Sequence, residues 1–178
     1  MKMFHCRWIC AFLLCGSVFA HGQSETGKTP EIVAPRPSAS SPAELEKSFF
    51  DIIRNGDALR FLAYVSPDGV NLGRNAQHAT RDEIEAQLTG HRGLYCKLFD
   101  ASCMTKTATQ EAAAPRCSYR ELLTQSEKVR TASTETTRNN VRQAILVAEV
   151  NNQKCGGAVL IDFIFNYEQG GWRLFSVP

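Results

Sequence analysis

The chain has 178 residues, of which 43% are hydrophobic and 21% are charged. Both fractions are close to those of average globular proteins, so the composition excludes a wholly disordered chain and a collagen-like chain. The formal net charge is +2, and without Lys2 and Arg7 the 20 basic residues become 18, equal to the 18 acidic ones. A neutral remainder without a basic block argues against nucleic acid or an anionic membrane as the main partner.

Residues 1–20 have the three parts of a secretory signal peptide. A positive end precedes a mostly apolar stretch at 8–19 and a cleavage point after Ala20. This stretch of about 12 residues is short for a membrane-spanning helix. We therefore predict an exported protein, periplasmic or extracellular, with no membrane segment after cleavage. Lipoprotein anchoring at Cys15 is a minor alternative, because Leu14 stands where lipoprotein signals carry a small residue.

The cysteines predict a disulfide framework, because an even number of them follows the leader. Four cysteines allow three pairings. We prefer one bridge that closes a short loop and a second that ties the start of a predicted strand region to the turn at 151–157. A zinc site is disfavoured, since the spacings contain no CxxC pair and no histidine is close in sequence. The preferred bridges are Cys96–Cys103 and Cys117–Cys155.

Residues 21–42 are interpreted as a disordered, Pro/Ser-rich linker. They hold four of the seven prolines, and such a composition buries little apolar surface. One folded domain is then expected over 43–178. That length suffices for a single hydrophobic core.

Three helices are predicted in the first part of this domain. The first begins after Ser41 with Pro42 at its first position and ends at Gly56. The second, shorter helix is capped by Asp57, and the third begins with a capping box that Thr80 opens. The expected buried positions are Leu45, Phe49, Ile52 and Ile53 in the first helix, Leu59 and Leu62 in the second, and Ile84 and Leu88 in the third.

Strands follow the helices. A short strand is expected at 70–73, residues 94–100 fit either a helical turn or a strand, and 104–116 is interpreted as an inserted loop. The apolar period then changes from 3.6 to 2, which predicts a meander of antiparallel strands. These strands are expected at 129–136, 141–150, 159–166 and 172–177. Helices first and a meander last indicate an α+β fold.

This order resembles the nuclear transport factor-like superfamily, which includes SnoaL-like proteins. The resemblance lies in the Asn55-Gly56-Asp57 break between two helices, the Ser66-Pro67-Asp68-Gly69 turn, the capped third helix and the closing hairpin at 167–174. It covers most of 43–178 and implies a cone, in which N-terminal helices pack on a strongly curved antiparallel sheet around a pocket. Ketosteroid isomerase-like members carry a tyrosine on the first helix, where this chain has Phe49 and Phe50.

The superfamily contains both enzymes and noncatalytic binding modules, so the site decides the function. Asp162 is the leading carboxylate, because apolar residues surround it in sequence and desolvation would suit it to acid or base chemistry in a pocket. The structural alternative is a solvated position or an arginine partner. Tyr64 fits a half-buried position near the pocket. His91, which precedes Arg92, fits either the mouth of the cone or the C-terminal end of the third helix.

No group of residues in the sequence is explained better by a catalytic role than by a structural one. Ser118 lacks the glycines of a nucleophile elbow, and no phosphate-binding loop or metal-ligand spacing is present. We therefore expect a disulfide-stabilised binding module without cofactor, binding a small molecule or a protein in the cone pocket, with a homodimer through the sheet as a further expectation. The alternative is a small pocket enzyme, of isomerase, dehydratase or hydrolase type, that uses Asp162 with Tyr64 or His91.

Overall fold

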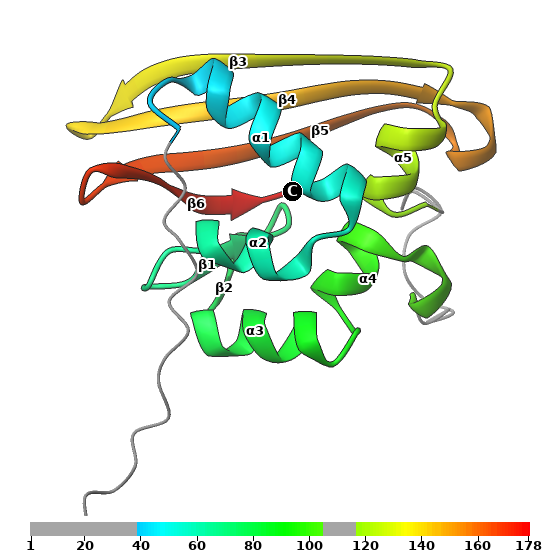
Figure 1. Ribbon diagram of the computed structural model, residues 1–178, viewed down its shortest axis with the longest axis horizontal. Coiled ribbons are helices and arrows are strands. Elements are labelled where there is room, and N and C mark those ends of the chain that lie inside the picture. Colours follow the sequence, from blue (N-terminus) through cyan, green and yellow to red (C-terminus); the bar gives the residue numbers. More distant parts are fainter. Residues whose placement is uncertain (1–38, 105–116) are drawn as a thin grey trace, which may run out of the picture. The chain divides into compact units, whose positions relative to one another are not determined.

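The computed structural model describes residues 39–104 and 117–178 (Figure 1). The predicted leader, nearly all of the predicted linker and nearly all of the predicted insertion lie outside these residues. Within the described part, no helix is both long enough and apolar enough to cross a membrane.

The first helix confirms its sequence signals. Helix α1 (Pro42–Asn55) begins after Ser41, whose side chain accepts a hydrogen bond from the Glu44 amide, and the four predicted core positions are buried. It ends at Gly56, whose φ of 70° lies in the left-handed region that glycine adopts without a steric penalty. Phe50 is buried as well, which widens the apolar face of the helix.

The second helix buries its predicted side chains only in part: Leu62 packs against the core and Val65 is buried, as expected. Helix α2 (Ala58–Tyr64) is capped by Asp57 as expected, but Leu59 is 71% exposed. Phe61 and Tyr64, three positions apart, face the core instead. The seven-residue helix is too short for the spacing of its leucines to fix its orientation, and the two larger rings bury more apolar surface.

Three further helices complete the helical part of the described chain. Helix α3 (Arg81–Thr89) begins with the predicted Thr80–Glu83 capping box and buries Ile84 and Leu88. The segment that sequence left open forms helix α4 (Leu94–Phe99), followed by the 3-10 turn η1 (Ala101–Cys103). Helix α5 (Tyr119–Gln125) also begins with a capping box, formed by Ser118 and Glu121.

The strands form a six-stranded sheet in the order β2-β1-β6-β5-β4-β3. The predicted meander is confirmed, and its neighbours pair antiparallel. Strand β1 is the predicted short strand and pairs parallel with β6, whereas β2 was not predicted. The strands are β1 (Val70–Leu72), β2 (Gln77–Ala79), β3 (Lys128–Arg138), β4 (Val141–Asn152), β5 (Gly157–Glu168) and β6 (Gly171–Val177), with the 3-10 turn η2 (Gln153–Cys155) between β4 and β5.

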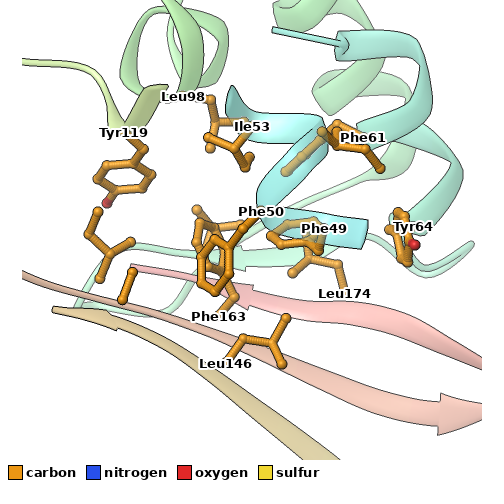
Figure 2. Close-up of a cluster of buried hydrophobic side chains, with 14 of the residues drawn as sticks. Phe49, Phe50, Ile53, Phe61, Tyr64, Leu98, Tyr119, Leu146, Phe163 and Leu174 are labelled. Carbon is orange, nitrogen blue, oxygen red and sulfur yellow. The ribbon is translucent and has the colours of Figure 1, made fainter. Parts of the chain in front are cut away.

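The inner face of this sheet packs against α1, and phenylalanine rings fill the space between them (Figure 2). The ring of Phe49 lies 4.9 Å from each of the rings of Phe163 and Phe165 and 5.6 Å from that of Phe61. All four rings have no exposed surface. The pocket between helix and sheet that the resemblance implies is therefore replaced, at this place, by a packed core.

The opposite, outer face of the sheet stays open to solvent in the described part of the chain. Side chains alternate along β5, so that 161, 163 and 165 are buried while 160 and 162 are exposed and 164 is half-buried. Leu160 is 62% exposed and Phe175 on β6 is 40% exposed. Apolar side chains are thus exposed to solvent on the outer face of the sheet.

Candidate binding site

The structure places Tyr64 inside the core. It is only 4% exposed, and its ring lies 5.5 Å from that of Phe49 and 5.9 Å from that of Phe165. Burial raises the pKa of its phenol, because the charged form would lose its hydration. Figure 2 shows the ring beside α1 and the sheet. Tyr64 was predicted to be half-buried near a pocket, and it is instead buried in the packed core.

His91 lies in the turn after α3. Its φ of 49° is in the left-handed region, and its ring stacks on Tyr95 at 4.2 Å between centroids. The side chain is exposed, and its backbone carbonyl lies 3.5 Å from the Cys96 sulfur. These contacts give His91 a role in shaping the turn between α3 and α4.

Asp162 lies on the outer face of β5, directly across from Val147 on β4. Its side chain is exposed, so the solvated position weighed from the sequence is the one observed. No ion pair of this carboxylate occurs among the described residues. Tyr64, His91 and Asp162 therefore occupy the core, a helical turn and the outer sheet face, and the fold does not bring them together.

The four cysteines form the preferred bridges. Cys96–Cys103 joins α4 to the following turn with its Cα atoms 5.4 Å apart, and Cys117–Cys155 joins the start of α5 to η2 with its Cα atoms 5.5 Å apart. Ser118, the hydroxyl considered as a nucleophile, is fully buried and is used in the cap of α5. The hydrogen bond from the Ser118 hydroxyl to the Glu121 carboxylate explains why a glutamate stands three residues after Ser118. No cluster of metal-ligating side chains occurs in the described parts of the chain.

One hollow of about 570 Å³ lies between the β1–β2 hairpin and α3. Two of its polar groups serve the local structure: the Glu83 carboxylate accepts from the Thr80 amide at 2.8 Å, and Gln87 Oε1 accepts from the Leu94 amide at 2.8 Å. His78 also lines it, and no phenylalanine, tyrosine or tryptophan does. Arg92, part of the predicted mouth, lines this hollow, whereas His91 does not.

A second hollow, of about 470 Å³, lies on the outer face of the sheet and is called the outer hollow below. It lies where the β3–β4 hairpin and the β1–β2 hairpin flank the central strands. The residues that line it include four side-chain amides, an exposed aromatic ring, a hydroxyl and a cation. They are Asn71, Asn139, Gln143, Asn166, Phe175, Ser176 and Arg138.

Two amides of the outer hollow, Gln143 and Asn166, are held in place by a chain of hydrogen bonds. Gln143 Nε2 donates to Asn166 Oδ1 at 2.9 Å, and Asn166 Nδ2 donates to Glu168 Oε1 at 3.2 Å. The buried Ser66 hydroxyl donates to Glu168 Oε2 at 3.3 Å. This chain runs across β4 and β5 and fixes which atom of each amide is left for a ligand.

The pairing of β5 and β6 is irregular at Phe175. Phe165 pairs with Leu174 and Ile164 pairs with Ser176, so Phe175 is an additional residue with no partner across the ladder. A β-bulge of this kind re-aims a side chain, and bulges are common beside functional sites. Phe175 faces outward by alternation from the buried Trp172 and Leu174, and the bulge places Ser176 on the same face beside it. Sequence reasoning missed both the bulge and the amides, because the register between strands is not a local property.

Comparison with known proteins finds no matching family model and no matching curated protein. Some solved structures are similar to this chain at low identity. "Rd1NTF2_04 with long sheet" has a TM-score of 0.40 at 10% identity, covering 77% of this chain and 97% of its own. "Rd1NTF2_05 with long sheet" has a TM-score of 0.38 at 10% identity, covering 76% and 93%. A substituted form of Rd1NTF2_05 has a TM-score of 0.41 at 10% identity, covering 75% and 91%.

The described residues form an α+β fold with N-terminal helices and a mostly antiparallel six-stranded sheet. Helices α1 to α3 with the short strand β1 precede the β3–β6 meander, and α1 packs on its inner face, in the order that the sequence resemblance predicted. This likeness concerns fold, and function is argued from the site.

Proposed function

We propose that the protein is a noncatalytic binding module that takes a small ligand in the outer hollow. The observation that carries the proposal is the joint presence of an exposed ring, Phe175, and hydrogen-bonded amides at Gln143 and Asn166. Ligand sites in proteins combine an apolar surface with a few oriented polar groups, and their usual volumes of about 300–1,000 Å³ include that of the outer hollow. The predicted binding function is kept, but its site moves from the interior to the sheet.

The geometry does not favour the pocket enzyme. Acid–base catalysis needs two titratable groups within hydrogen-bond reach of one substrate. Tyr64 is buried among phenylalanine rings, while Asp162 and His91 are exposed on separate elements. None of the three lines either hollow described above.

The two disulfides indicate an oxidising compartment. Together with the predicted signal peptide, they support a periplasmic or extracellular location for the binding function. A ligand met there would be a molecule outside the cytoplasm.

The experiment is a screen of a small-molecule fragment library by ¹H–¹⁵N NMR on the chain from residue 21. We expect hits that shift the side-chain NH₂ signals of Gln143 and Asn166. Phe175→Ala is expected to abolish these shifts, and Leu59→Ala, at an exposed leucine on α2, is the matched control that keeps them. Hits that shift only signals of α3 and the β1–β2 hairpin would move the site to the other hollow.

A second candidate function is self-association through the remainder of the outer face. Leu160 is 62% exposed and shares this face with the half-buried Ile145 and Val147. The face bears acids on β4 and β5 (Glu149 and Asp162) and bases on β3 (Lys128 and Arg130), so a second copy of the chain offers opposite charges to it.

Light scattering after size-exclusion chromatography tests this homodimer. A concentration-dependent mass of two chains that Leu160→Asp converts to one chain, while Leu59→Asp does not, would support it. A monomer at all concentrations would contradict it.

A further inference from the structure

The chemistry of the outer hollow narrows the class of ligand, on the assumption that the proposed function holds. Four of its side chains are amides, and each amide carries both donors and acceptors. The bond between Gln143 and Asn166 uses one donor of the first and one acceptor site of the second. Gln143 Oε1 and the second hydrogen of Asn166 Nδ2 are left, so the pair offers an acceptor beside a donor.

Asn71 and Ser176 provide a second polar pair. They lie opposite each other in the β1–β6 ladder, at the rim formed by the β1–β2 hairpin. Within residues 39–104 and 117–178 neither side chain has a hydrogen-bond partner. A hydroxyl and an amide at this spacing again present donor and acceptor together.

Phe175 supplies an apolar surface between these polar groups. Its ring is 40% exposed, which is unusual for a phenylalanine in a strand whose neighbours Leu174 and Val177 have no exposed surface. A wholly apolar ligand would cover the ring but leave the amides unpaired, which costs binding free energy. An anion would have one cation, Arg138, at the rim. The ligand that fits has hydroxyls on its edge and a C–H face.

We propose that the outer hollow binds a saccharide. One face of the sugar ring packs on Phe175, and its hydroxyls exchange hydrogen bonds with Gln143, Asn166 and Asn71. Hydroxyl groups donate and accept at the same time, and so match amide side chains in a way that purely donating or purely accepting groups do not. The fixed amide orientation set by Glu168 and Ser66 makes the hollow selective among hydroxyl arrangements.

The proposal is tested by titrating the ¹⁵N-labelled chain from residue 21 with glucose, galactose, N-acetylglucosamine and glucuronate. A monosaccharide has about 12 non-hydrogen atoms, and at ordinary efficiency per atom its Kd is about 1–10 mM. We expect one or more of these sugars to shift the NH₂ signals of Gln143 and Asn166 with saturation. Phe175→Ala and Gln143→Ala are each expected to weaken binding at least about tenfold, while Leu59→Ala leaves it unchanged.

The outcomes separate this proposal from the proposed function. Sugar-dependent shifts at these amides that depend on Phe175 support it, and preference for glucuronate that Arg138→Gln removes assigns an acidic sugar. Fragments that bind the outer hollow while all four sugars leave the amides unshifted at about 50 mM overturn the saccharide and keep the binding site. If neither sugars nor fragments shift these signals, both proposals are wrong.

Discussion

The side chains of Gln143 and Asn166 are joined by a hydrogen bond of 2.9 Å across β4 and β5, at the point where the two residues pair in the ladder. A cross-strand pair of this kind contributes roughly 0.2–1 kcal/mol to stability. Its larger effect is on orientation, because the carboxylate of Glu168 holds the other end of Asn166.

A double-mutant cycle measures this coupling. We expect Gln143→Ala and Asn166→Ala to lower the free energy of unfolding by about 1 kcal/mol or less each, and the double variant by less than their sum. Urea denaturation of the four proteins gives the coupling energy. Strict additivity would show that the two amides do not restrain each other in solution.

The core prediction concerns Phe49, the ring that contacts two phenylalanines of β5 and one of α2. Phe49→Ala removes these contacts and leaves a cavity between α1 and the sheet, so we expect a loss of about 3–5 kcal/mol in unfolding free energy. Leu59→Ala, at a leucine 71% exposed, should change it by less than about 0.5 kcal/mol. Urea melts check both values, and a small loss for Phe49→Ala would mean that the interior is loosely packed.

Periodicity and capping predicted most of this fold because they are local properties. The caps at Ser41, Asp57 and Thr80 and the alternation along β5 each act within a few residues. The predicted burial of Leu59 on α2 was wrong, because the side chains that meet α1 are decided by tertiary packing. Strand β2 was missed since three residues with two polar side chains carry no periodic signal.

The disulfide pairing leads to a sharp test of connectivity. One bridge lies entirely before the segment between Cys103 and Cys117, and the other lies entirely after it. Either alternative pairing would link the part of the chain before this segment to the part after it. A variant with a site-specific protease sequence in place of residues 108–113 should therefore, after cleavage, give two separate fragments on a denaturing gel without reductant. Fragments that separate only after reduction would show a different pairing.

The two bridges should also differ in their contribution to stability. The Cys117–Cys155 bridge spans 38 residues and the Cys96–Cys103 bridge spans 7. The entropy of loop closure predicts about 4 kcal/mol for the first and about 2.4 kcal/mol for the second. Thermal melts of the two double Cys→Ser variants give the order, and a larger loss from the shorter bridge would contradict the entropic account.

The Thr80–Glu83 capping box predicts part of the acid sensitivity. Hydrogen bonds from the Thr80 amide and hydroxyl hold the pKa of the Glu83 carboxyl below its usual 4.5. Because the folded-state pKa is the lower one, the stabilisation is present above pH 4.5 and is lost as pH falls through the folded pKa. We expect Glu83→Gln to lower the Tm near pH 7 and to lose this difference at about pH 2–3. A Tm difference that persists in acid would mean that the charge of Glu83 does not contribute.

The candidate site was only partly accessible from the sequence. Asp162 stood out because apolar residues surround it along the chain, but alternation in a strand sends neighbours to opposite faces, so sequence neighbours are not spatial surroundings. The amides of the outer hollow come from β1, the β3–β4 turn, β4 and β5, and a bulge places Ser176 beside Phe175 on the same face. Such a site depends on the register between strands, which no local pattern encodes.

Asp162→Asn separates the binding module from the pocket enzyme. The side chain is exposed beside Leu160 and Ile164 on the outer face, and no ion pair within the described parts of the chain depends on it. An exposed carboxylate with no ion pair among the described residues loses little when it is neutralised, so we expect the unfolding free energy to change by less than about 0.5 kcal/mol. The Tm difference between the variant and the parent chain should stay constant from pH 5 to 8. A buried ion pair would instead cost about 3–5 kcal/mol when one partner is removed.

The ligand shifts at Gln143 and Asn166 should also survive in Asp162→Asn, because Asp162 is not among the residues that line the outer hollow. If Asp162→Asn lost ligand binding while its melting curve stayed unchanged, Asp162 would be part of the binding site, and this result would support the enzyme alternative.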